Sequence, residues 1–157
     1  MRARCLLVAV ALFGCSGEED ERCGPSSGIV ARVVDGDTVE LESGEKIRYL
    51  MIDTPESTTE IECYGEEAKE FNASLVEGKE VQLEYDVECK DRFDRTLAYV
   101  TVDDREVNSL LVERGFACVL YIPPNGEGRM DDFESLEAVA EAENRGLWGA
   151  CEENPCN

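Results

Sequence analysis

The hydrophobic and polar positions after residue 28 change period several times, and each period predicts a different element. Alternation of apolar and polar residues, interrupted by turn-forming residues, predicts five short strands. These strands are expected at residues 29–34, 38–41, 46–52, 80–87 and 96–102. Apolar residues at helical spacing predict helices at about 64–77, 106–114 and 131–145. This order predicts an α+β fold, a five-stranded Greek-key β-barrel of the OB type with about three helices.

The first residues carry a different pattern, which is typical of a segment that directs export. Two arginines precede nine apolar residues, 5–13, a run too short for a membrane span and suited to a signal-peptide core. The run ends in Leu-Phe-Gly-Cys, which resembles the lipobox of bacterial lipoproteins and makes Cys15 the expected lipidation site. Ordinary secretory cleavage nearby is the alternative. We therefore expect a signal peptide (1–14), a lipidated Cys with an acidic tether (15–28), one domain (29–151) and a tail (152–157).

This segment predicts the location of the protein. It would be exported and lipid-anchored at the bacterial cell envelope, or secreted if the lipobox is not used. No stretch of the sequence is long and apolar enough to cross a bilayer, so contact with a membrane is expected through the lipid alone. We expect a monomer.

Charge and composition narrow the functional classes. The 157 residues include 36 Asp and Glu, 15 Lys and Arg and no His, for a net charge of −21. Loss of residues 1–14 would remove two arginines and no acid, giving −23. A charge of this size argues against a broad basic face for nucleic acid, although a local basic site is compatible with it. The absence of His excludes Ser-His-Asp and Cys-His catalysis and zinc sites built on His.

Three polar clusters carry candidate chemistry, and each alone has a purely structural explanation. Asp35-Gly36-Asp37-Thr38 is typical of a hairpin turn. Arg48 lies in an apolar strand, where a guanidinium needs an anion, and Asp53 to Glu56 follow that strand as an ion-pair partner and a turn. Alternation places Arg48 and Asp53 on opposite faces unless the strand bends. Residues 90–95 are typical of a solvated loop.

Together the clusters indicate one site. Carboxylates at strand ends offer hard oxygen ligands for calcium, two arginines can neutralise a phosphate, and a glutamate can take a proton from water. That set suffices for metal-assisted hydrolysis of a phosphodiester without His.

The chain resembles the thermonuclease family, the staphylococcal-nuclease-like domain, over about residues 29–149. The order and spacing of several stretches carry the resemblance rather than any single motif. These stretches are VVDGDTVEL (33–41), IRYLMIDTPES (47–57), CYGEEAKEF (63–71), DRFDRTLAYV (91–100), VNSLLVERGFACVLYI (107–122) and GLW (146–148) after a Glu/Ala-rich helix.

The resemblance implies a calcium-dependent nuclease that cleaves DNA or RNA and leaves a 3′-phosphate. Calcium would be bound by the carboxylates of Asp37 and Asp53 and the backbone carbonyl of Thr54, with Asp35 behind them. Glu56 would hold the attacking water, as general base or as the group that orients it. Arg48 and Arg95 would clamp the phosphate. Residues implied to contact the substrate are Arg92, Phe93 and Tyr121.

Some positions depart from the family pattern. Phe93 stands where a Tyr would donate a hydrogen bond to a nucleotide phosphate, so that bond is lost. Pro123 replaces one of two aromatic residues at the nucleotide site, and Tyr121 retains the other. Asp94 stands where Gly is usual and offers Arg95 a competing carboxylate.

Six cysteines follow Cys15, and an even number in an exported chain predicts up to three disulfides with 15 possible pairings. The family fold suggests Cys63 with Cys89 across two loops beside the site. It also suggests Cys118 with Cys151, which leaves Cys23 with Cys156.

Two other classes of function remain open from the sequence. The first is a non-catalytic OB-type module that binds nucleic acid or protein. Such a module would not need the full set of charged residues, which argues against this class. The set comprises Arg48, Arg95, Asp37, Asp53 and Glu56. The second is a disulfide-stapled surface lipoprotein that binds another protein, which would require a contiguous apolar patch.

Overall fold

The computed structural model describes residues 23–153 and residue 156. The predicted signal peptide, Cys15 and most of the acidic tether therefore lie outside the described residues. Within the described part of the chain, no helix is both long and apolar enough to cross a membrane.

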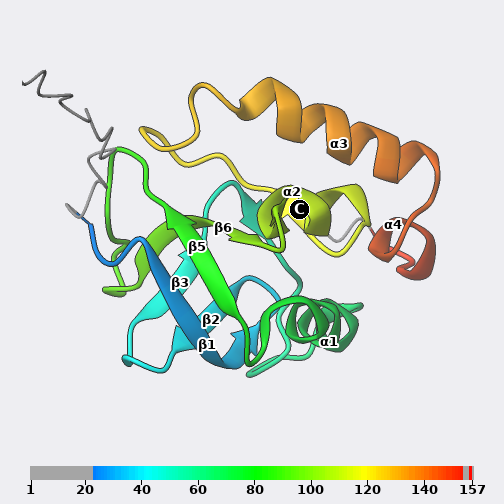
Figure 1. Ribbon diagram of the computed structural model, residues 1–157. Coiled ribbons are helices and arrows are strands. Elements are labelled where there is room, and N and C mark those ends of the chain that lie inside the picture. The colour runs from blue at the N-terminus through cyan, green and yellow to red at the C-terminus, as the bar shows by residue number, and fades with distance from the viewer. Residues whose placement is uncertain (1–22, 154–155, 157) are drawn as a thin grey trace, which may run out of the picture.

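Five strands form a closed barrel, as predicted (Figure 1). They are β1 (Ser27–Asp35), β2 (Thr38–Leu41), β3 (Lys46–Tyr49), β5 (Glu80–Glu84) and β6 (Thr96–Val102). The sheet order is β3-β2-β1-β5-β6, and β3 also pairs in parallel with β6, which closes the ring. Three two-residue strands lie outside it: β7 (Arg105–Glu106) extends the sheet at β6, and β4 (Ile52–Asp53) pairs with β8 (Cys118–Val119).

The three predicted helices are present as α1 (Gly65–Val76), α2 (Val107–Glu113) and α3 (Met130–Ala142), and a single unpredicted turn, α4 (Leu147–Ala150), follows. In Figure 1, α2 lies between the barrel and α3, while α1 covers another side of the barrel. Helix α3 begins one residue earlier than predicted, after Arg129, and no side chain caps it.

A buried amide fastens α2 to the barrel. Asn108 is fully buried, accepts the N–H of Val100 and donates to the carbonyl oxygens of Leu50 and Ala98. These bonds satisfy polar groups that would be costly to bury alone. They also fix the chain where β3 ends, just before the residues of the candidate site.

The predicted strand 46–52 is interrupted. It stops at Tyr49, turns through Leu50 and Met51, and resumes as β4. Met51 has a φ of 67°, a left-handed conformation that is uncommon for a side chain of its size. The predicted strand 80–87 likewise ends early, at Glu84.

All six cysteines after Cys15 are paired, but none of the three predicted pairings is present. The disulfides join Cys23 to Cys89, Cys63 to Cys151 and Cys118 to Cys156, with Cα separations of 5.0, 5.9 and 5.5 Å.

Long-range packing explains the first two of these pairings. Because β1 runs antiparallel to β5, with Ser27 opposite Gln82, the residues before β1 lie beside those that follow β5. That places Cys23 next to Cys89. The turn at Gly115 and Phe116 brings Cys63 to Cys151, because the Phe116 ring stacks on Tyr64 and the Gly115 carbonyl accepts the N–H of Leu147.

Candidate active site

The interruption between β3 and β4 brings Arg48 and Asp53 together. The bend that alternation alone required is present, and Nη2 of Arg48 lies 2.6 Å from Oδ1 of Asp53. Nη1 of Arg48 donates to the carbonyl oxygens of Tyr49 and Ile52, at 2.8 and 2.7 Å, so the guanidinium itself closes the turn. Arg48 is 8% exposed, whereas the Asp53 side chain is 58% exposed and faces the solvent side of the site.

The side chain of Asp37, just before β2, contacts the same guanidinium group of Arg48. Its Oδ2 lies 3.2 Å from Nη2 of Arg48 and accepts both the N–H and the hydroxyl of Thr54, at 2.9 and 3.1 Å. Gly36 permits this approach, because a Cβ there would lie 2.6 Å from the Thr54 hydroxyl. Asp37, Asp53 and Thr54, the three predicted calcium ligands, therefore surround one guanidinium.

Arg95 is oriented by Asp91, which sequence reasoning did not select. Nε and Nη2 of Arg95 lie 2.7 and 2.6 Å from Oδ2 of Asp91, a two-point contact that fixes the plane of the guanidinium. Asp94, expected to compete for Arg95, instead binds the amine of Lys90 at 2.8 Å. Burial alone would raise the pKa of Asp91, but hydrogen bonds from Arg95 and Phe93 outweigh it and hold that pKa below its usual value.

Glu56 lies at the entrance of a closed loop. Its N–H donates to Oε2 of Glu62, and its carbonyl accepts the N–H of Glu62, both at 2.9 Å. Partial burial, followed by the nearby charge of Asp35, raises the pKa of the Glu56 carboxyl. Asp35 in turn accepts the hydroxyl of Ser57 at 2.7 Å. A carboxylate with a raised pKa is a better proton acceptor than an ordinary exposed one.

These groups line one cleft of about 730 Å³. Its ionisable lining residues are Asp35, Asp37, Arg48, Asp53, Glu56, Glu88, Lys90, Asp91, Arg92 and Arg95. Six carboxylates against four cations give the cleft a formal charge of −2. This net negative charge would repel a phosphate. The cleft therefore needs a bound cation, in addition to the arginines, before it can bind a phosphate.

The apolar wall of the cleft differs from the expectation. Phe93 lines it, is 64% exposed and lies beneath the guanidinium of Arg92, 4.7 Å from the ring centre. Tyr121 does not line the cleft but packs, half-buried, against the core. Its neighbours Leu120 and Ile122 face the cleft instead. Adjacent residues of an extended chain point to opposite sides. A shift of one residue in register therefore exchanges Tyr121 with Leu120 and Ile122.

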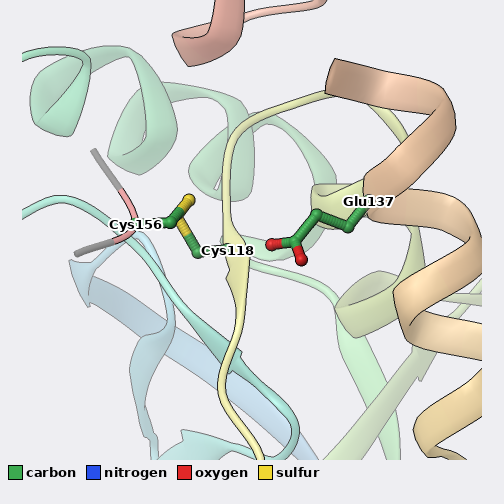
Figure 2. A group of neighbouring side chains, drawn as sticks. All are labelled: Cys118, Glu137 and Cys156. Atoms are coloured by element: carbon green, nitrogen blue, oxygen red, sulfur yellow. A yellow bond between two sulfur atoms is a disulfide. The ribbon is translucent and has the colours of Figure 1, made fainter. Parts of the chain in front are cut away.

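A second group of side chains of metal-ligating types lies outside the cleft. Figure 2 shows Cys118, Glu137 and Cys156, whose ligand-type atoms lie within 4.8 Å of one another. The two sulfur atoms are joined in a disulfide and offer no thiolate. One carboxylate oxygen of Glu137 accepts the N–H of Val119 at 2.7 Å. The cluster is thus explained as a structural joint between β8, α3 and the C-terminal segment.

Comparisons with known proteins agree with this geometry. A family model described as staphylococcal nuclease homologue matches residues 46–150. The chain is 35% identical over 126 residues to a thermonuclease of Staphylococcus intermedius, covering 76% of this chain and 74% of that protein. It is 37% identical to the SPbeta prophage-derived endonuclease YokF and 36% identical to endonuclease YncB, both of Bacillus subtilis, each over 124 residues and 74% of this chain. The matches span 42% of YokF and 59% of YncB.

Proposed function

Because the chain belongs to the family of staphylococcal nuclease homologues, we propose that it is a nuclease that hydrolyses phosphodiester bonds of DNA, RNA or both. One observation carries the proposal: two guanidinium groups and three carboxylates, from parts of the chain far apart in sequence, converge on a single cleft. These residues are Arg48, Arg95, Asp37, Asp53 and Glu56. A binding module has no need of this full set.

The residues divide the reaction between them. Arg95 donates a hydrogen bond to the phosphate. Arg48, whose Nη1 and Nη2 atoms are engaged within the protein, supplies positive charge, and both arginines stabilise the extra negative charge of the five-coordinate transition state. The contact with Asp91 uses Nε and Nη2 of Arg95. Nη1 makes a long hydrogen bond of 3.5 Å to the Thr38 hydroxyl and retains a second N–H for the substrate. Glu56 takes a proton from the attacking water. A bond forms between the water oxygen and phosphorus, and the bond to the 5′-oxygen breaks. The 5′-oxygen takes a proton from solvent, so that the products are a 3′-phosphate and a 5′-hydroxyl.

We further propose Ca²⁺ as the cofactor. All the donors available at the site are oxygens, which calcium prefers, and the formal charge of −2 matches a divalent cation. The ion would be held by the carboxylates of Asp37 and Asp53 and the backbone carbonyl of Thr54. It would supply positive charge toward the phosphate. Its affinity is expected to be weak, because only two carboxylates contribute.

The test compares cleavage of single-stranded DNA and RNA by the purified, oxidised protein in Ca²⁺ and in Ca²⁺ with excess EGTA. Glu56→Gln preserves shape but cannot take the proton, and it should lower kcat by about 10²–10³. Glu66→Gln, at an exposed position in the first turn of α1, is the matched control and should cleave normally. Full activity in EGTA would refute the calcium proposal. A folded protein without cleavage in any condition would refute the nuclease.

We also propose that the protein is exported and lipid-anchored through Cys15. The lipobox-like sequence supports this proposal, as do three disulfides in the described residues, which persist in oxidising compartments. Expression with a radiolabelled fatty acid should label the protein, and Cys15→Ala should remove the label. Labelling that survives the substitution would refute the anchor.

A further inference from the structure

We infer that a second groove beside Arg95 binds the phosphate next to the scissile one, so that the enzyme prefers substrates with more than one phosphate. This inference rests on the proposed nuclease function and extends it. The groove, of about 490 Å³, is lined by residues of the hairpin between β2 and β3 and of the loop before β6. It adjoins the catalytic cleft, because Lys90, Phe93 and Arg95 line both.

The barrel's register brings the cations of this groove together. Strand β3 pairs in parallel with β6, with Ile47 opposite Thr96, so the residues just before them, Lys46 and Arg95, lie side by side. A bridge between Lys90 and Thr96 holds Lys90 at the same place. Three positively charged side chains from three segments therefore gather at one end of the barrel.

The charge balance of this groove differs from that of the protein. The residues that line the groove, Lys46, Lys90 and Arg95 with Glu45 and Asp94, give it a formal charge of +1 in a chain of −21. Arg95 is also paired with Asp91 of the adjoining cleft, so the charge that the groove adds comes mainly from Lys46 and Lys90. The catalytic cleft, by contrast, carries −2. Glu40, which pairs with Lys46 across β2 and β3, is bound by Arg32. A strand of nucleic acid that leaves the cleft past Arg95 on this side therefore meets Lys46 and Lys90.

Asp94 limits the strength of the subsite. Its carboxylate lies 2.8 Å from the amine of Lys90, and its φ of 65° lies in the left-handed region. Asn is also tolerated there, so Asp94→Asn should release Lys90 without straining the loop. Two substitutions then act in opposite directions on one groove: Lys46→Ala removes a cation, and Asp94→Asn removes a competing anion.

The experiment measures kcat/KM on a dinucleotide, which has only the scissile phosphate, and on an octanucleotide. Matched controls exist for both substitutions. Lys79→Ala removes a lysine that is paired with Asp103 and lines neither groove. Asp104→Asn changes an exposed Asp with a φ of 59°, also outside both grooves. In the Glu56→Gln background, fluorescence anisotropy measures binding of the octanucleotide without cleavage.

Loss of one phosphate contact should lower kcat/KM on the octanucleotide about fivefold at low salt and reduce the magnitude of the salt slope by about 0.7. Lys46→Ala should show this loss without changing cleavage of the dinucleotide. Asp94→Asn should show a gain that is larger on the octanucleotide than on the dinucleotide, because the released Lys90 lines both grooves. Equal effects of Lys46→Ala and Lys79→Ala would overturn the subsite, as would an equal loss on both substrates. If the wild-type protein cleaves neither substrate, the nuclease proposal fails, and the anisotropy results still decide the subsite.

Discussion

Removal of the Cys63–Cys151 disulfide should weaken both the fold and the catalytic loop. Cys63 directly follows Glu62, which exchanges hydrogen bonds with the backbone of Glu56, and it lies two residues before α1. Its bond to Cys151 fastens this loop to the chain after α4. The double substitution Cys63→Ser with Cys151→Ser removes the fastening without leaving a free thiol.

The size of the effect follows from the length of chain that the bond closes. The two cysteines are 88 residues apart, and the loop-entropy model gives about 4.6 kcal/mol for a loop of that length. The Cys118–Cys156 bond already offers a slightly shorter covalent path between the same ends, which reduces the figure to about 4 kcal/mol. Domains of this size unfold with about 5–15 kcal/mol, so the variant should fold with a reduced margin.

Urea unfolding of the oxidised variant measures the change in the free energy of unfolding. Phe133→Ala separates stability from geometry, because it removes a fully buried ring of α3 outside the cleft and should cost a similar 3–5 kcal/mol. Under conditions in which both variants are folded, the disulfide variant should lose kcat, whereas Phe133→Ala should retain it. An unfolding free energy within 1 kcal/mol of the wild type would refute the entropic reasoning. Equal kcat values would refute the role in the loop.

Three further predictions concern groups that hold the site in place. Gly65→Ala should lower kcat, because a Cβ there would overlap the carbonyl oxygen of Glu56, and a normal rate in a folded variant would contradict this. Asn108→Ala should cost about 2–4 kcal/mol in thermal or urea unfolding, because it leaves buried backbone groups unpaired. The pKa of Asp91 is lower in the folded protein than in the unfolded chain. The ionised carboxylate therefore stabilises the fold at pH values above its unfolded-state pKa of about 3.9, and this stabilisation is lost as pH falls through its folded-state pKa. Asp91→Asn should thus reduce unfolding free energy at neutral pH, and the difference should vanish in strong acid. A constant difference across pH would show that Asp91 acts through packing instead.

The regular elements could be predicted from the sequence because their signals are local. Alternation and helical spacing located the five barrel strands and three helices to within a few residues, and turn residues such as Gly36 marked the hairpins. The turn at Met51 could not be predicted this way. Nothing in its residue type indicates a positive φ, and Arg48 stabilises the turn through carbonyl oxygens that face it only after the chain has folded.

The errors share one cause, since each depended on contacts between distant segments. Two of the disulfides are set by the antiparallel register of β1 and β5, by the stacking of Tyr64 and Phe71 on Phe116, and by the hydrogen bond from Leu147 to Gly115. The orientation of Tyr121 depends on which side of an extended segment faces the barrel. Because side chains alternate between the two sides, an error of one residue reverses the predicted orientation. Asp91 could have been noticed, because an acid four residues before Arg95 in one loop is within reach of its guanidinium.

The proposed nuclease carries a net charge of −21, so its site has to attract a polyanion that the protein as a whole repels. At physiological salt the screening length is about 8 Å, so a bound phosphate responds mainly to the charges that line its own groove. The five cations there are Lys46, Arg48, Lys90, Arg92 and Arg95, of the twelve within residues 23–153. The carboxylates give the catalytic cleft a formal charge of −2, so its cations are too few to bind a phosphate until a divalent ion is present. The residues that line the second groove carry a net positive charge without such an ion. Metal binding would therefore precede productive binding of the scissile phosphate, and the neighbouring phosphate would be the part of the substrate that the protein can hold unaided.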